Sequence, residues 1–211
     1  KDSSIELDKM ESYINDVKKI KEKYKDQIKI NIGAEVDYIE GFEEEIKNNL
    51  NKYGEYLEDS ILSVHMIKIE DKYYCMDFSC EEFEKIVNLL GSVESVYNLY
   101  YETLIKAINS DLGKYKPKRI GHLNLVRKYN KKFPYDYSNN KKLKELVKLI
   151  SDRGYELDYN IAGLFKEDCG ETYISGYLAE LIKQYNIKLV LGSDSHSAKY
   201  IDKYEELNEH I

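Results

Sequence analysis

Five short apolar segments, separated by stretches of helical periodicity, constrain the fold of this chain more than any other feature of its sequence. They lie at about residues 28–36, 60–65, 118–122, 155–160 and 187–192. A strand followed by a helix and a second strand places the two strands parallel in one sheet. The alternation therefore predicts an α/β fold with a parallel sheet.

Helix signals fill the intervals between the apolar segments. Ser3 and Glu6 have the spacing of a capping box before a first helix of about six turns, and Ser79 and Glu82 repeat that spacing. Gly154 stands where a helix would end. We expect further helices at about residues 42–53, two between 79 and 111, one around 143–150 and one at 174–185, with a short extended excursion or hairpin at 67–76.

The length of 211 residues, without a repeat or a Pro/Gly/Ser-rich linker, indicates a single domain over residues 1–211. Five strands are fewer than a closed β/α barrel needs. We therefore expect that the first β/α units of such a barrel are missing from this chain, which starts at Lys1.

Composition and net charge indicate in which compartment, and with which kinds of partner, the protein is expected to work. No stretch approaches the roughly 18 apolar residues that cross a bilayer, and no charged-then-apolar leader opens the chain, so we expect a soluble protein without a membrane partner. The three cysteines are an odd number and widely spread, which favours a reducing cytoplasm over a disulfide framework. A net charge of -7 disfavours nucleic acid as a partner.

Side chains of metal-ligand type follow the predicted strands. Glu35, His65, His122, Asp194 and His196 all lie at or just beyond a predicted carboxyl end. In parallel α/β folds these ends meet on one face, where active groups gather. Imidazole mixed with carboxylate suits divalent zinc, manganese and iron. The pattern therefore predicts a metal site built from side chains that are far apart in the chain.

Each of these residues has an ordinary structural alternative when it is taken alone. A histidine at a strand end, such as His65 or His122, is more often a hydrogen-bonded structural residue than a ligand. Asp194 could cap the following helix, and Glu35 could face solvent. We favour the metal site because the alternatives require separate coincidences on one face. The Ser-Asp-Ser-His run at 193–196 also lets one turn present a carboxylate and an imidazole.

Two basic residues are candidates for binding an anionic substrate. Arg127 lies on the loop beyond His122, where a guanidinium could hold a phosphate, and an exposed surface charge is an equally good interpretation. Lys166, in the loop after Asn160, is a second candidate, for which a solvated position is the simpler interpretation. Arg119 begins a strand, so we expect it at the opposite end in a structural role.

Four segments carry most of these residues. They are Gly-Ala-Glu-Val-Asp-Tyr at 33–38, Asp-Ser-Ile-Leu-Ser-Val-His at 59–65, Pro-Lys-Arg-Ile-Gly-His-Leu at 117–123 and Gly-Ser-Asp-Ser-His at 192–196. In this order, over nearly the whole chain, they resemble the polymerase and histidinol phosphatase (PHP) superfamily of metallo-phosphoesterases. Leu-Val-Arg-Lys at 125–128 suggests its branch of Bacillus-like histidinol-phosphate phosphatases. The His-x-His segment that opens the family is lacking here.

The resemblance implies a distorted seven-stranded, TIM-like β/α barrel of the PHP type. It also implies a centre of two or three divalent metal ions, zinc, manganese or iron. By that resemblance the metal ligands would be Glu35, His65, His122, Asp194 and His196.

The implied activity is hydrolysis of L-histidinol phosphate, a small phosphate monoester, to L-histidinol and inorganic phosphate in histidine biosynthesis. Metal-bound hydroxide would attack phosphorus, while Asp194 or His196 orients it or assists protonation of the leaving alkoxide. Arg127 would bind the phosphate oxygens, and Asp37 is one place where the cationic end of the substrate could bind.

Two rival functions stay open. One is a PHP-superfamily phosphoesterase that acts on another phosphate ester or on a nucleic-acid 3′ end. The net charge of -7 and the absence of interleaved aromatic and basic residues disfavour nucleic acid. The other is a catalytically silent metal-binding domain, which the missing first ligands would favour.

Overall fold

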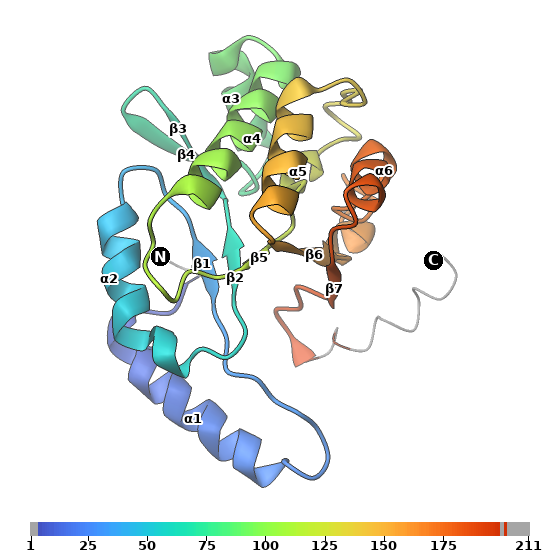
Figure 1. Cartoon of the computed structure of the whole chain (residues 1–211). Helices are drawn as coiled ribbons and strands as arrows, with labels where there is room; N and C mark the ends of the chain where they lie inside the picture. Colours follow the sequence, from blue (N-terminus) through green and yellow to red (C-terminus); the bar gives the residue numbers. More distant parts are fainter. Residues whose placement is uncertain (1–3, 199–200, 202–211) are drawn as a thin grey trace.

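A five-stranded parallel sheet forms the centre of the molecule in the computed structural model, which describes residues 4–198 and 201 (Figure 1). The sheet order is β1-β2-β5-β6-β7, and each neighbouring pair is parallel. The predicted α/β fold with a parallel sheet is confirmed. In the described part of the chain β1 and β7 are the two edges, so the sheet is open there. The strands are β1 (Glu35–Asp37), β2 (Ile61–Ser63), β5 (Arg119–Ile120), β6 (Glu156–Asn160) and β7 (Leu189–Gly192).

Helices connect these strands, and a hairpin of β3 (Met66–Ile69) and β4 (Lys72–Cys75) follows β2. The hairpin and the expected helices are confirmed, although the first helix begins only at Met10. Ser79 caps α3 by accepting a hydrogen bond from the Glu82 amide, while Ser3 lies outside the described residues. The α-helices are α1 (Met10–Lys23), α2 (Glu43–Tyr53), α3 (Cys80–Leu90), α4 (Val93–Asn109), α5 (Lys141–Asp152) and α6 (Gly176–Gln184). Short 3-10 helices are η1 (Leu7–Lys9), η2 (Gly54–Tyr56), η3 (Leu125–Arg127) and η4 (Ala162–Phe165).

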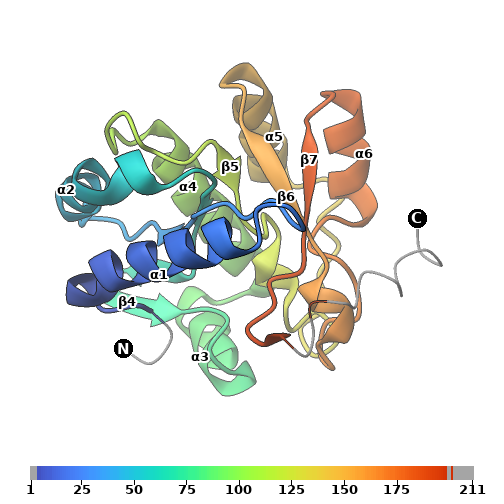
Figure 2. The same cartoon turned by 90° about the horizontal axis from the view of Figure 1, so that it is seen from below.

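The core lies between the sheet and the layer of helices α3 to α6, which contact one another in chain order (Figure 1). α4 contributes the largest share of buried tyrosines, including Tyr97, Tyr100 and Tyr101. α1 lies apart from this layer, nearest the viewer in Figure 2, and packs in a smaller cluster through Met10 and Ile14. The helix layer therefore supports one side of the sheet, and the ends of the strands stay available for a site.

The first strand is shorter than predicted, because only Glu35–Asp37 joins the ladder. Before it, the Ile32 carbonyl accepts from the amides of Glu58 and Asp59 in an irregular pairing. Gly33 permits this close approach, since a Cβ there would lie 1.8 Å from the Asp59 carbonyl oxygen. The alternating residues 28–34 are therefore extended chain without regular strand pairing.

Two further features of the described chain bear on its class. None of its described helices combines the length and apolar character that crossing a bilayer requires. Cys75, Cys80 and Cys169 are free thiols, as their irregular spacing predicts.

Candidate metal centre

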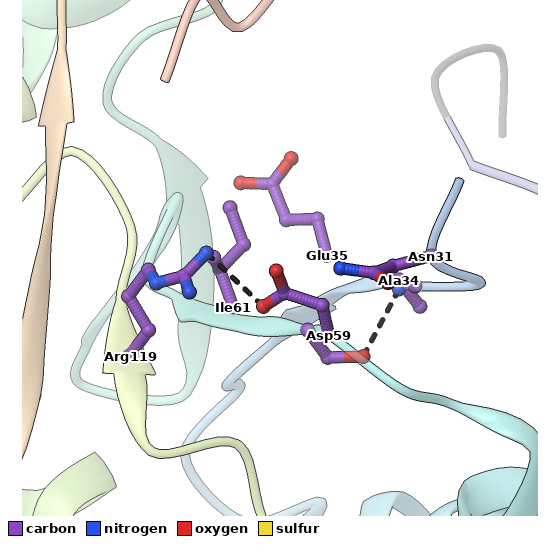
Figure 3. Close-up of a pocket in the computed structure, with 8 residues that line it drawn as sticks. Asn31, Ala34, Glu35, Asp59, Ile61 and Arg119 are labelled. Atoms are coloured by element: carbon purple, nitrogen blue, oxygen red, sulfur yellow. Dashed lines mark hydrogen bonds and ion pairs between the residues drawn. The ribbon is translucent and has the colours of Figure 1, made fainter. Parts of the chain in front are cut away.

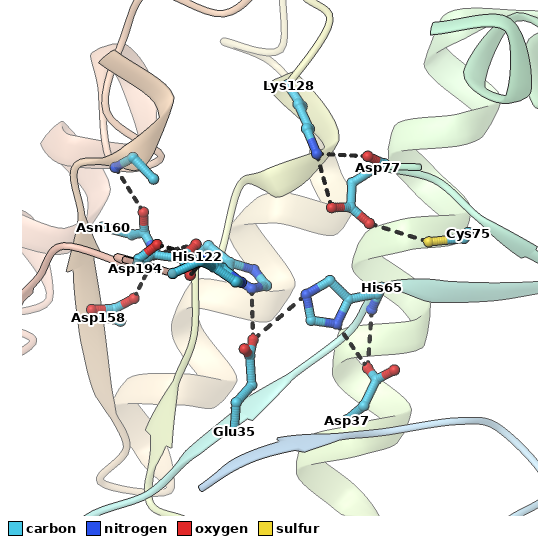
Figure 4. Close-up of polar contacts among 12 residues, drawn as sticks. Glu35, Asp37, His65, Cys75, Asp77, His122, Lys128, Asp158, Asn160 and Asp194 are labelled. Atoms are coloured by element: carbon cyan, nitrogen blue, oxygen red, sulfur yellow. Dashed lines mark hydrogen bonds and ion pairs between the residues drawn. The ribbon is translucent and has the colours of Figure 1, made fainter. Parts of the chain in front are cut away.

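Three of the five predicted ligands meet in one cluster, although they come from different strands. One ligand atom from each of Glu35, His65 and His122 lies within 4.8 Å of the other two. Oε1 of Glu35 is 2.9 Å from Nε2 of His122 and 3.5 Å from Nε2 of His65 (Figure 4). The two imidazole rings lie edge to face with centroids 4.8 Å apart. We call these three residues the Glu-His-His cluster.

Strand register explains how the cluster assembles. His65 and His122 lie just beyond β2 and β5, as predicted, and the structure shows that these two strands are neighbours in the sheet. The prediction of a carboxyl-end position is wrong for Glu35, which begins β1 and is paired with Ile61. Its longer side chain spans the difference and reaches both rings.

The charges of the cluster stabilise one another. Burial alone raises the pKa of Glu35, but the hydrogen bond and charge of His122, with Ser63 and His65, lower it to about 2. Burial alone lowers the pKa of His65, whereas the hydrogen bond and charge of Asp37, with Glu35 and Asp77, raise it to about 9. These shifts favour a Glu35 carboxylate beside a protonated His65 imidazole near neutral pH.

Asp37 orients His65 and is not free for a substrate. Oδ1 of Asp37 accepts from the His65 amide at 3.2 Å and lies 3.1 Å from its Nδ1. This contact leaves Nε2 of the ring directed toward Glu35. A carboxylate behind a histidine fixes its tautomer and ring orientation, as in many metal sites. The geometry thus opposes the expectation that Asp37 meets the cationic end of a substrate.

Asp194 and His196 lie outside the Glu-His-His cluster in the described structure, beyond the end of β7. Oδ2 of Asp194 accepts from Nδ2 of Asn160 at 3.3 Å. Nδ1 of His196 lies 3.0 Å from the carbonyl oxygen of Asp194, and the His196 side chain is 86% exposed. Asp194 is therefore tied to the sheet through Asn160, whereas His196 projects from the surface.

Lys166 shares a pocket with this pair. The pocket has a volume of about 400 Å³ and is also lined by Phe165, Asp194 and His196. An ammonium group in a pocket with a carboxylate and an imidazole can receive an anionic group. The structure therefore brings Lys166 together with two of the predicted catalytic residues.

Arg127 occupies a different setting from the one expected of a free phosphate-binding residue. Its Nε donates to Glu171, and its guanidinium lies 4.5 Å from the ring centre of Tyr137. Burial lowers the pKa of Arg127, but the Glu171 hydrogen bond and charge raise it above its usual value. Direct phosphate binding by Arg127 stays a prediction, and it would require this ion pair to open.

Sequence reasoning missed a charged group beside His65. Nζ of Lys128 donates to the carbonyl of Asp77 at 2.6 Å and to its carboxylate at 3.0 Å. The Cys75 thiol donates to the same carboxylate at 3.2 Å. Burial raises the pKa of Asp77, but Lys128 and His65 lower it overall. The group forms where the chain just after the hairpin meets the loop after β5. The sequence alone does not show that these two segments meet.

A second pocket opens at the starting ends of the strands. It has a volume of about 330 Å³ and is lined in part by Glu35, Asp59 and Arg119 (Figure 3). Arg119 pairs with Asp59 at 3.1 Å and with Glu156 at 3.6 Å. These ion pairs at the starts of the strands agree with the structural role expected for Arg119. The Glu35 side chain, which also lines this pocket, is 36% exposed.

The Glu-His-His cluster fits a divalent cation. Two imidazoles and a carboxylate are the donor set that zinc, manganese and iron accept. Nδ1 of His122 is buried without a hydrogen-bond partner among the described residues, although a buried polar atom is normally paired. Nε2, the other nitrogen of that ring, faces Glu35. One ring nitrogen thus lacks, among the described residues, the partner that a bound cation would supply, while the other already contacts a proposed ligand.

The chain is similar to several known proteins. A family model described as the PHP domain matches residues 4–162. Histidinol-phosphatase of Bacillus subtilis (strain 168) is 43% identical over 202 residues, which are 94% of this chain and 75% of that protein. The probable histidinol-phosphatase of Schizosaccharomyces pombe is 28% identical over 95% of this chain and 63% of its own length. A crystal structure of a proposed histidinol phosphatase, hisK, from Listeria monocytogenes has a TM-score of 0.92 at 34% identity, covering 99% of this chain and 78% of that one.

Proposed function

This chain belongs to the PHP domain family, and on that premise we propose that it is a metal-dependent phosphatase that hydrolyses L-histidinol phosphate. The products are L-histidinol and inorganic phosphate, so the reaction is the phosphatase step of histidine biosynthesis. The oxygen of water bonds to phosphorus, and the bond between phosphorus and the histidinol oxygen breaks. The leaving alkoxide then takes up a proton.

The observation that carries this proposal is the convergence of Glu35, His65 and His122 from three adjacent strands. A phosphate monoester carries about two negative charges at neutral pH, and its uncatalysed hydrolysis is extremely slow. A catalyst must therefore supply positive charge and a nucleophile. The relative that is 43% identical is a histidinol-phosphatase, which supports histidinol phosphate as the substrate.

We assign metal binding to five residues. Three of them form the Glu-His-His cluster, in which the side chains already contact one another. Divalent cations held there would neutralise the phosphate oxygens and lower the pKa of a water molecule. The donor types suit zinc, manganese or iron, and we propose two or three ions because the resemblance to the PHP superfamily implies that number. The proposed ligands are Glu35, His65, His122, Asp194 and His196.

The chain's own residues divide the remaining work. Asp37 holds the ring of His65 so that its Nε2 stays directed into the cluster. Asp194 or His196 would assist the leaving alkoxide by holding or delivering a proton. His196 is the better placed of the two to exchange that proton with water, because its side chain is 86% exposed.

Substrate binding is assigned to Lys166 ahead of Arg127. Lys166 lines the same pocket as Asp194 and His196, so its ammonium can meet a phosphate oxygen near them. Arg127 donates to Glu171 and is mostly buried, so its positive charge is already compensated. We keep Arg127 as a second candidate that depends on opening this ion pair.

The full fold is proposed to be the distorted seven-stranded barrel of the PHP type, with residues 1–211 as part of one domain. The parallel order β1-β2-β5-β6-β7 is compatible with such a barrel. The relatives in Bacillus and Listeria are longer than this chain, which covers 75% and 78% of them. A cytoplasmic location is proposed because all three cysteines are free thiols.

The proposal is tested by measuring phosphate release from L-histidinol phosphate, a panel of other phosphate monoesters and single-stranded DNA. We expect the highest kcat/KM on histidinol phosphate, loss of activity after chelation, and recovery with zinc or manganese. The variant His122→Ala controls for a contaminating phosphatase, since it lacks a proposed ligand.

Two outcomes would replace this function by a rival. Faster release of nucleotides from DNA than of phosphate from histidinol phosphate would indicate a nucleic-acid phosphoesterase. Metal binding without turnover of any ester would indicate a silent metal-binding domain.

A further inference from the structure

The backbone segments that carry His122 and Asp194 share an uncommon conformation. The φ angle is +23° at His122 and +50° at Asp194, in the region that favours glycine. A residue with a side chain keeps such a conformation only where its surroundings hold it. Strand β6 is the neighbour of β7 in the sheet and is therefore placed to hold the Asp194 segment.

Asn160, the last residue of β6, secures the Asp194 side. Its Nδ2 donates to Oδ2 of Asp194 at 3.3 Å and to Oδ2 of Asp158 at 3.0 Å. Its Oδ1 accepts from the Ala162 amide at 3.0 Å, and the residue is only 1% exposed. Every polar atom of this side chain is therefore engaged in one orientation (Figure 4).

Asp158 secures Asn160 in turn. It lies two residues before Asn160, so both side chains leave the strand on the same face. Its Oδ2 accepts from Nδ2 of Asn160 at 3.0 Å, which fixes the orientation of that amide. The carboxylate also fills the space beside Gly192, where a Cβ would lie 1.9 Å from its Oδ1.

We propose that Asp158 and Asn160 are positioning residues that hold the segment of Asp194 where the metal centre requires it. They act through Asp194 and are not themselves among the proposed ligands. This inference rests on the proposed function, because it assigns Asp194 to the metal centre. It adds two residues whose alteration changes the site without removing a ligand.

Two variants of Asn160 test the inference in the full chain. Asn160→Ala removes all its side-chain hydrogen bonds. Asn160→Asp keeps an acceptor for the Ala162 amide but lacks the donors to Asp158 and Asp194. We expect both variants to change the visible absorption of bound Co²⁺ and to lower kcat by about 10- to 100-fold, with KM changed less than about threefold. Wild-type behaviour of Asn160→Asp would overturn the inference, because only the turn at Ala162 would then matter.

Variants of Asp158 separate positioning from proton transfer. Asp158→Asn keeps an oxygen that accepts from Asn160, whereas Asp158→Ala does not. We expect Asp158→Ala to resemble Asn160→Ala and Asp158→Asn to retain most of the wild-type kcat and Co²⁺ spectrum. An equal loss of kcat in both variants would overturn positioning by Asp158, since the negative charge or the proton of its carboxyl group would then determine kcat.

Asn140 provides the matched control. It is also buried, but it caps α5 by accepting from the Leu143 amide. We expect Asn140→Ala to lower the Tm without changing the Co²⁺ spectrum. The spectra are recorded with Co²⁺ alone, so they test positioning even if the wild type fails to hydrolyse histidinol phosphate. Unchanged spectra in both Asn160→Ala and Asp158→Ala would refute the inference while leaving the proposed function intact.

Discussion

The two groups of proposed metal ligands differ in how firmly the protein holds them. Glu35, His65 and His122 contact one another, and the His122 side chain is only 2% exposed. Asp194 is tied to the sheet through Asn160, and the His196 side chain is 86% exposed. One group is thus held by contacts among its own members, while the other is open to solvent.

The difference arises from what surrounds each strand end. The His122 carbonyl lies 3.5 Å from the hydroxyl of Tyr100, which belongs to the core helix α4, and Asp37 fixes His65 from behind. The segment after β7 instead lines a pocket with Lys166. Preorganised ligands cost less to order on binding. We therefore expect the Glu-His-His cluster to bind the first metal ion and the β7 segment to complete the site.

The largest effect is expected from removing a ligand of the rigid group. His122→Ala should lower kcat for histidinol phosphate by more than about 1000-fold, beyond the 10- to 100-fold typical of residues that only support ligands. Circular dichroism and the Tm would verify that the variant folds. Activity within about tenfold of wild type in a folded, metal-loaded variant would remove His122 from the site.

A smaller effect is expected in the open group. Asp194→Asn should lower kcat by at least about 100-fold, because it removes a charged ligand but can still accept from Asn160. His196→Ala should cost less than Asp194→Asn, since its side chain projects into solvent. Steady-state kinetics of both variants check this order. The reverse order would mean that the β7 segment rearranges to make His196 the dominant ligand.

The strand-helix alternation was sufficient to predict a parallel sheet and to place His65 and His122 just beyond strand ends, but it did not predict that their strands are neighbours. It could not place Glu35, because residues 28–34 alternate like a strand yet pair irregularly around Gly33. Periodicity reports which residues face the same side. It does not report whether two segments come close enough to form a regular ladder.

Pairings between distant segments were also beyond the sequence. Arg127 and Glu171 are 44 positions apart, and nothing in their local context indicates that they form an ion pair. Asp158 lies between Leu157 and Tyr159, two residues that are hydrophobic in the sequence, so strand alternation predicts that its carboxylate faces solvent. The structure shows instead that it is 6% exposed. Such contacts depend on how loops pack, which local patterns do not encode.

A moderate effect of pH should distinguish the two groups. In the metal-free protein His65 is protonated below its pKa of about 9. A metal ion binds only the neutral imidazole and displaces that proton, so affinity for the first ion should rise about tenfold per pH unit from pH 6 to 8. Competition with a chromophoric zinc chelator measures this slope. A flat profile would mean that the first ion binds elsewhere.

Asp37→Asn provides the control for that titration. Asp37 contributes the main favourable interaction with protonated His65, so its loss should lower the pKa of the imidazole. The rise in affinity should then level off at a lower pH than in the wild type. An unchanged profile would show that another group sets the proton competition.

The smallest effect is expected at Arg127, which links the loop after β5 to the loop that carries Lys166. Glu171 accepts from Arg127 and also from Asn130 at 2.7 Å, so it anchors the second loop. If this anchoring is the role of Arg127, Arg127→Ala and Glu171→Ala should each raise KM about two- to fivefold and should not add in the double variant. Arg153→Ala, on the exposed end of α5, is the matched control that should leave KM unchanged. A KM increase above about 30-fold in Arg127→Ala alone, with Glu171→Ala close to wild type, would instead assign the guanidinium to the phosphate, since charged hydrogen bonds to a substrate contribute about 1.5–3 kcal/mol.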